Sequence, residues 1–175
     1  MSRRSLLVGP LAVVVASTFA PLSVAAASQE GRSRTVHVSG TGVSDANAPV
    51  GLSCDATGRC LVSTLIPGSV TGDVQGATIG RGAAYGNITT GDYFGSSVLM
   101  ISGAVAGCGT GSFTVSLADF SGNLALPAPA SGVVVPGSGT GELDAVSGRA
   151  SFAFTPGQAG AGTYTYTMKL RCRRP

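Results

Sequence analysis

The sequence is poor in the residue types that usually carry catalysis, metal binding and charge. It has no tryptophan, one histidine (His37) and one lysine (Lys169), and charged residues make up 11% of its 175 residues, against about 25% in an average domain. It contains no G-x-S-x-G, H-E-x-x-H, P-loop or EF-hand motif, the patterns that would indicate a nucleophile, a metal or a phosphate site. We therefore predict no catalytic residue, no metal ligand and no cofactor.

The chain also carries little net positive charge. The formal net charge of +3 falls to +1 when Arg3 and Arg4 are set aside, because nine basic residues then face eight acids. Such a balance does not predict contact with nucleic acid or with an anionic membrane surface, and it argues against an ionic ligand.

The N-terminus has the three parts of a secretory signal peptide. Arg3 and Arg4 form a basic region, Leu6 to Ala20 is apolar, and Ala25 to Ala27 offers a small-x-small cleavage site. Cleavage after Ala27 predicts a secreted protein that begins at Ser28. Prolines interrupt the apolar stretch, so we expect no stable membrane insertion after cleavage. A Sec signal is favoured, and a twin-arginine signal is the alternative.

Four cysteines in a secreted chain of this size predict two disulfides. Cys54 and Cys60 flank a turn-like segment, which favours pairing them with each other and leaves Cys108 to pair with Cys172. No C-x-x-C motif is present and the only histidine is isolated, so a zinc site is not predicted.

Residues 35–175 are predicted to form one all-β domain, preceded by a flexible segment at 28–34. Short strand patterns recur between Gly, Pro, Asn and Asp, and no segment has a sustained helical period. The predicted strands are Thr35–Gly40, Cys60–Ile66, Ser69–Gln75, Ala77–Ile88, Ser96–Ala106, Gly111–Ala118, Ser131–Val135 with Gly141–Leu143, Ala150–Phe154 and Gly162–Leu170. Eight or nine antiparallel strands without a covering helix predict a closed barrel, with a two-sheet sandwich as the alternative.

Strict alternation in the last third of the chain predicts which side chains face inward. Inward positions carry bulky apolar groups, whereas Thr163, Thr165 and Lys169 should face outward. The inward aromatic residues either pack a core or line a ligand cavity, because an eight-stranded barrel is just wide enough for either. They are Phe113, Phe152, Phe154, Tyr164 and Tyr166.

Four segments together resemble a known family: Cys108 to Phe113, Val134 to Leu143, Val146 to Gly148, and Gly162 to Tyr164. They are similar to bacterial proteins of unknown function with an allene oxide cyclase-like barrel, a superfamily that includes the plant dirigent proteins. The resemblance covers nearly half of the mature chain. It implies an eight-stranded antiparallel barrel and agrees with a bond between Cys108 and the last strand, but no catalytic residue of those families aligns here.

Few polar residues remain as candidates for chemistry. His37 lies between Val36 and Val38, so it should face away from them on a strand. Glu142 and Asp144 are two apart and would share one face of an extended segment, either as an acid and base pair or as solvated edge residues.

Three functions remain open. We expect a secreted, non-catalytic barrel that binds an apolar small molecule or a partner. The alternatives are an enzyme of the cyclase or dirigent type, which shapes a reactive intermediate, and a β-sandwich resembling the actinobacterial apoproteins of enediyne chromophores or a structural envelope protein. The sequence leaves the oligomeric state open.

Overall fold

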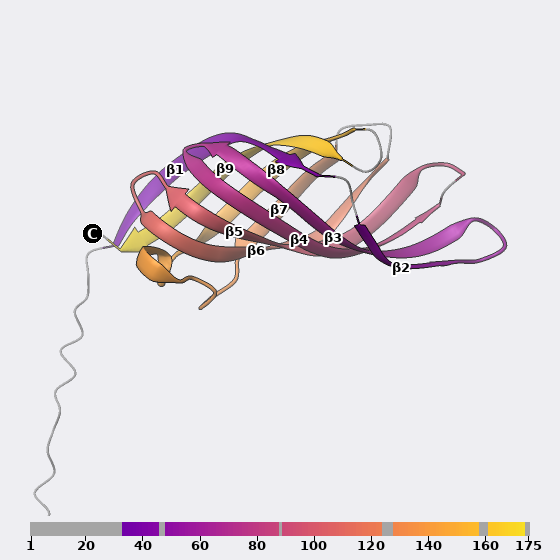
Figure 1. Cartoon of the computed structure of the whole chain (residues 1–175), viewed down its shortest axis with the longest axis horizontal. Helices are drawn as coiled ribbons and strands as arrows, with labels where there is room; N and C mark the ends of the chain where they lie inside the picture. The colour runs from indigo at the N-terminus through magenta and orange to yellow at the C-terminus, as the bar shows by residue number, and fades with distance from the viewer. Residues whose placement is uncertain (1–32, 46–47, 88, 124–127, 158–160, 174–175) are drawn as a thin grey trace, which may run out of the picture.

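Nine strands and one short 3-10 helix make up nearly all of the described chain (Figure 1). The structure is a computed structural model that describes residues 33–45, 48–87, 89–123, 128–157 and 161–173. The elements are β1 (Ser33–Ser44), β2 (Ala48–Cys54), β3 (Arg59–Gly72), β4 (Val74–Asn87), β5 (Asp92–Val105), β6 (Gly109–Asn123), β7 (Ala128–Val134), η1 (Gly141–Leu143), β8 (Ser147–Pro156) and β9 (Gly162–Arg173).

The sheet closes on itself, which decides between barrel and sandwich. Its strand order is β1-β9-β8-β7-β6-β5-β4-β3-β2, and β1 also pairs with β3. Eight antiparallel strands therefore form a closed barrel, as predicted, and β2 lies outside it on the edge of β3. Among the described residues, no helix is long and apolar enough to cross a membrane.

One part of the wall extends far beyond the barrel. β1 pairs with β3 only at Gly68–Gly72. In contrast, β3 and β4 stay paired out to Arg59 and Asn87, β4 and β5 out to Gly86 and Tyr93, and β5 and β6 out to Asp92 and Asn123. We call this extension the wing: residues 59–65, 81–87 and 92–98, with β2 at one edge and the end of β6 at the other. Figure 1 shows it projecting along the long axis of the molecule.

The barrel interior is filled by the side chains that the alternation placed inward. β9 alternates buried and exposed residues without a break from Gly162 to Arg173. Phe113 and Tyr166 are 1% and 2% exposed, and the residues predicted to face outward on β9 are exposed. Leu143 and Val146 are buried and belong to the same core cluster, so the segment around η1 packs against the barrel interior.

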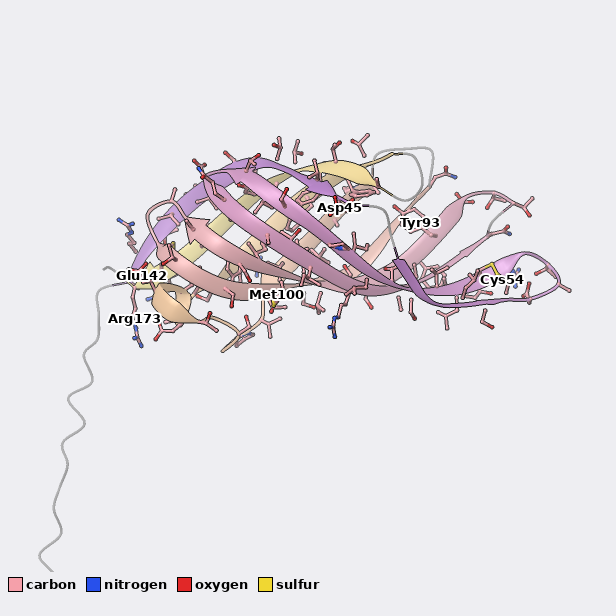
Figure 2. All side chains as sticks on the ribbon, viewed as in Figure 1. Asp45, Cys54, Tyr93, Met100, Glu142 and Arg173 are labelled. Carbon is pink, nitrogen blue, oxygen red and sulfur yellow. A yellow bond between two sulfur atoms is a disulfide. The ribbon has the colours of Figure 1, made fainter. Side chains whose placement is uncertain are left out.

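Both predicted disulfides are present. Cys54–Cys60 joins the ends of β2 and β3 at the tip of the wing (Figure 2). Cys108–Cys172 ties the turn between β5 and β6 to the end of β9. In the first hairpin Asp55 accepts hydrogen bonds from the Thr57 and Arg59 amides at 2.8 and 3.0 Å, and Gly58 has a φ of 80° that favours glycine.

Several strand predictions were wrong. No break occurs near Pro67: β3 continues through it, and Pro67 lies where the neighbour of β3 changes from β2 to β1. β2 was missed because its sequence, APVGLSC, has weak strand character. Gly141–Leu143 was predicted as a strand but forms η1, since Gly141 has a φ of 61° and the Leu143 amide donates to the Thr140 carbonyl.

The predicted N-terminal boundary moves slightly. β1 begins at Ser33, within the segment 28–34 that was predicted to be flexible. The predicted signal peptide, residues 1–27, and residues 28–32 lie outside the described part of the chain.

Candidate functional site

The five aromatic residues proposed to line a cavity meet inside the barrel. Phe152 and Tyr164 are buried on paired strands, with ring centroids 6.0 Å apart in an edge-on contact. Phe154 is partly buried against the same cluster. These contacts are those of a packed core, and a ligand among these side chains stays a prediction.

The tyrosine hydroxyls inside the barrel form hydrogen bonds with backbone groups. The Tyr166 hydroxyl donates to the Thr71 carbonyl at 3.1 Å and accepts from the Val74 amide at 2.9 Å. Burial raises the pKa of both Tyr164 and Tyr166. They therefore stay protonated at neutral pH and act as hydrogen-bond donors rather than as bases.

Glu142 and Asp144 do not form an acid and base pair. Glu142 accepts hydrogen bonds from the Thr110 amide and hydroxyl at 2.7 and 3.0 Å, and these bonds lower the pKa of its carboxyl. Asp144 forms an ion pair with Arg173 at 3.1 Å. Figure 2 places Glu142 and Arg173 at the end of the molecule opposite Cys54. Both carboxylates hold the segment around η1 against the barrel, and η1 is not the extended segment that the pairing required.

The groups that the sequence left isolated come together on the outer wall of the barrel. His37 of β1 is directly opposite Lys169 of β9, which is directly opposite Arg149 of β8. One step along the strands, Ser39, Thr167 and Ser151 form a second row in the same way. Six exposed side chains thus form two parallel rows, one basic and one of hydroxyls.

These two rows line a hollow of about 340 Å³, which we call the groove. Val38 and Met168 contribute the remaining lining atoms. Side chains directly opposite on neighbouring antiparallel strands are about 5 Å apart at Cβ. One small ligand can therefore contact all three strands at once.

Positive charge predominates in the groove. In the described part of the chain the ion pair of Arg173 with Asp144 is the only one, so neither Lys169 nor Arg149 is neutralised by a carboxylate there. Arg171 adds a further cation along β9 and bonds the Ser33 hydroxyl at 2.8 Å. One carboxylate adjoins the groove: Asp73 accepts hydrogen bonds from the amide and hydroxyl of Ser39 at 2.8 and 3.3 Å. Although the chain has few charges, its cations gather on this wall.

Like charges directly opposite each other destabilise a sheet. The basic row therefore lowers the stability of this wall, and a bound anion would offset the repulsion. Ammonium and guanidinium groups donate to carboxylate, sulfate or phosphate oxygens, and hydroxyls can donate alongside them. The groove can therefore bind an anionic group. It holds no carboxylate pair or thiol among the described residues, and His37 has no hydrogen-bond partner in that part of the chain.

The sequence placed His37 correctly, facing away from buried Val38, but did not show that it meets Arg149 and Lys169. Those residues lie 112 and 132 positions away along the chain. Only the β1–β9–β8 register joins them, and no local pattern encodes that register. The outward alternation of β9, with Lys169 and Arg171 on one face, is the signal that could have pointed to this wall.

Comparison with known proteins supports the fold. No protein-family model matches the chain, and no curated protein matches its sequence. A protein of unknown function from the DUF3224 family of Shewanella oneidensis MR-1 has a similar structure, with a TM-score of 0.59 and 18% sequence identity. The similarity covers 81% of this chain and all of that one. At this identity it shows the β-barrel fold alone.

Proposed function

We propose that the mature protein is an exported, non-catalytic binding barrel whose groove holds the anionic group of a small amphipathic molecule. The observation that carries the proposal is the basic row His37–Lys169–Arg149 beside the hydroxyl row Ser39–Thr167–Ser151. The aliphatic parts of the Lys169 and Arg149 side chains and the methyl group of Thr167 would contact the rest of the ligand.

Export is part of the proposal. Two disulfides are compatible with an extracellular or periplasmic protein, because the reducing cytosol disfavours such bonds. The signal-like N-terminus supports the same compartment. Mass spectrometry of the protein recovered from the medium of its source should give a chain that begins at Ser28, whereas a full-length intracellular chain would contradict export.

The non-catalytic part of the proposal rests on the groups in the groove. Proton transfer or nucleophilic attack needs a reactive group that a second group orients. The groove offers cations and hydroxyls, which hold an anion but do not form such a pair. The closed eight-stranded wall also supports kinship with allene oxide cyclase-like barrels, without carrying over any of their catalysis.

Binding can be tested with a fluorescent aryl sulfonate and its neutral sulfonamide analogue. The mature protein should bind the sulfonate saturably and more tightly than the analogue, and added salt should weaken the binding. Because a hydrogen bond to a charged group contributes about 1.5 to 3 kcal/mol, Lys169→Met and Arg149→Met should each weaken binding about tenfold or more.

Arg81→Met is the matched control, since it removes one positive charge from an exposed position on the wing. It should leave sulfonate binding unchanged. Equal losses in all three variants would mean that net charge alone attracts the probe. Binding that survives Lys169→Met but is lost in Tyr164→Ala would place the ligand inside the barrel instead, and turnover of any bound compound would favour the enzymatic alternative.

A further inference from the structure

The wing exposes apolar side chains that a soluble sheet normally buries or avoids. Leu61 of β3, Tyr85 of β4 and Phe94 of β5 are directly opposite one another in a single row. Leu61 and Phe94 are 51% and 60% exposed, and the rings of Tyr85 and Phe94 contact each other with centroids 5.5 Å apart. This aromatic row lies on the outer side of the wing, opposite the face of the buried Cys60.

More apolar side chains lie on the same face. Alternation along paired strands adds Ile79, Val98 and Met100, each more than a third exposed. A large side chain presents roughly 200 Å² when fully exposed, so these six together expose about 500 Å². That value is near the upper end for the largest apolar patch of a monomer, about 300 to 600 Å². We call this face the platform.

We infer that the platform is the contact surface between two copies of this chain, packed face to face with their wings antiparallel. In this arrangement each copy covers Leu61, Tyr85, Phe94 and Val98 of the other, about 400 Å² of apolar surface per copy. With the polar side chains of the same rows the total for both copies is about 1,000 Å², the lower limit for a specific interface. The platform is one face of a sheet of several paired strands, and packed sheets are about 10 Å apart, so a second sheet fits it better than a small molecule does.

The order of the rows along the wing favours this arrangement. Next to the aromatic row is a row of small residues, Ser63, Ala83 and Ser96, formed by the same strand pairing. Consider a two-fold axis that lies in the plane of the interface, parallel to these two rows and midway between them. It places the aromatic row of each copy on the small-residue row of the other. Large side chains then fill the space that small ones leave, as packing at native density requires.

The same axis also sets Arg81 within reach of a carboxylate of the other copy. Arg81 lies two residues from Ala83 on β4 and is exposed on the platform. The axis places it over Asn87 of the other copy, which is opposite Arg59 on β3. On β5, Asp92 lies one residue beyond the last pair that β5 forms with β4, so the Arg81 side chain reaches this carboxylate by turning away from Arg59. Asp92 also accepts a hydrogen bond from the Asn123 side chain at 2.9 Å, which fixes its position. The two-fold symmetry makes this Arg81–Asp92 contact twice.

Sedimentation velocity of the mature protein tests the interface over a concentration series reaching about 100 μM, where weak dimers are detected. A dimer should appear as concentration rises. Phe94→Ser and Leu61→Ser should each weaken dimerisation about tenfold or more, because central aromatic and apolar anchors dominate interfaces. Leu52→Ser is the matched control: Leu52 is 64% exposed on β2 but is opposite Val62, on the face of the wing turned away from the platform, and its loss should change nothing.

Charge exchange tests the orientation of the two copies. Arg81→Asp and Asp92→Arg should each weaken the dimer, and the double variant should restore it, with circular dichroism confirming the fold of all three. A protein that stays monomeric throughout, or a dimer unaffected by Phe94→Ser, would overturn the inference. A monomer that binds neutral phosphatidylcholine vesicles through Phe94 would likewise overturn it and make the platform a membrane contact. None of these outcomes affects the groove, which lies on the opposite wall.

Discussion

Tyr166→Phe should destabilise the barrel far more than the loss of one oxygen atom suggests. Tyr166 is 2% exposed, and its hydroxyl lies at the turn where β3 gives way to β4. It accepts the Val74 amide hydrogen at 2.9 Å and donates to the Thr71 carbonyl at 3.1 Å. This hydroxyl therefore connects β9 to the β3–β4 turn across the barrel interior.

The magnitude follows from what the substitution leaves behind. The aromatic ring stays, so the apolar packing of the core is retained, but the amide of the fully buried Val74 loses its partner. A buried polar group left unsatisfied costs about 1 to 3 kcal/mol. We expect a loss in the free energy of unfolding within that range.

Urea denaturation of the mature protein measures this loss, and an unchanged m-value would show that the compactness of both states is the same. Hydrogen exchange at the Val74 amide should quicken relative to the rest of the barrel. Tyr85→Phe is the control, because Tyr85 is 38% exposed on the wing. A Tyr166→Phe protein as stable as the Tyr85→Phe protein would refute the reasoning.

Three further predictions follow from the covalent frame and the titrating groups. In the chain-entropy model, loss of Cys108–Cys172, with a sequence separation of 64, should lower the free energy of unfolding by about 4 kcal/mol. Loss of Cys54–Cys60, with a separation of 6, should lower it by about 2 kcal/mol, so denaturation should show Cys172→Ser to be less stable than Cys60→Ser. Hydrogen bonds from Thr110 lower the pKa of Glu142, so the ionised carboxyl stabilises the fold above the ordinary carboxyl range, and this effect is lost as the pH falls through the lowered pKa. The difference in Tm between wild type and Glu142→Gln should therefore shrink below about pH 4, and a constant difference would contradict this. Burial raises the pKa of Tyr164 and Tyr166, so the folded state is favoured below the ordinary pKa range of tyrosine and loses stability above it. Tyrosinate absorbance at 295 nm should reach its full value only when the protein unfolds in alkali, and complete reversible titration of the native protein would count against burial of these hydroxyls.

The sequence determined the fold class and much of the core. Strict alternation over β8 and β9 gave the buried face, because a side-chain period of two is set by strand geometry itself. The absence of any helical period excluded a covering helix. The cysteine spacing pointed to both disulfides, since a turn-like segment of five residues lies between Cys54 and Cys60.

Local sequence failed where conformation depends on distant partners. β2 contains Pro49 and Gly51 and has weak strand character, yet it forms because β3 pairs with it. Gly141–Leu143 alternates like a strand end but turns into η1, held by Glu142 on Thr110 and Asp144 on Arg173. Both contacts join residues about thirty positions apart, beyond the reach of any local pattern.

Tertiary structure alone decided the two surfaces proposed for binding. His37, Arg149 and Lys169 are scattered in the sequence, and they share a row only because closure of the barrel sets β1 and β8 on either side of β9. Likewise, Leu61 and Tyr85 were predicted only as ordinary strand residues, and Phe94 was outside the predicted strand Ser96–Ala106, which begins earlier in the structure, at Asp92. They form one row because the pairing of β3, β4 and β5 sets them opposite one another on the outer face of the sheet, where all three stay more than a third exposed. Which side chains alternate is a local property of the backbone, whereas which ones meet is set by the register of strands that the chain brings together from far apart.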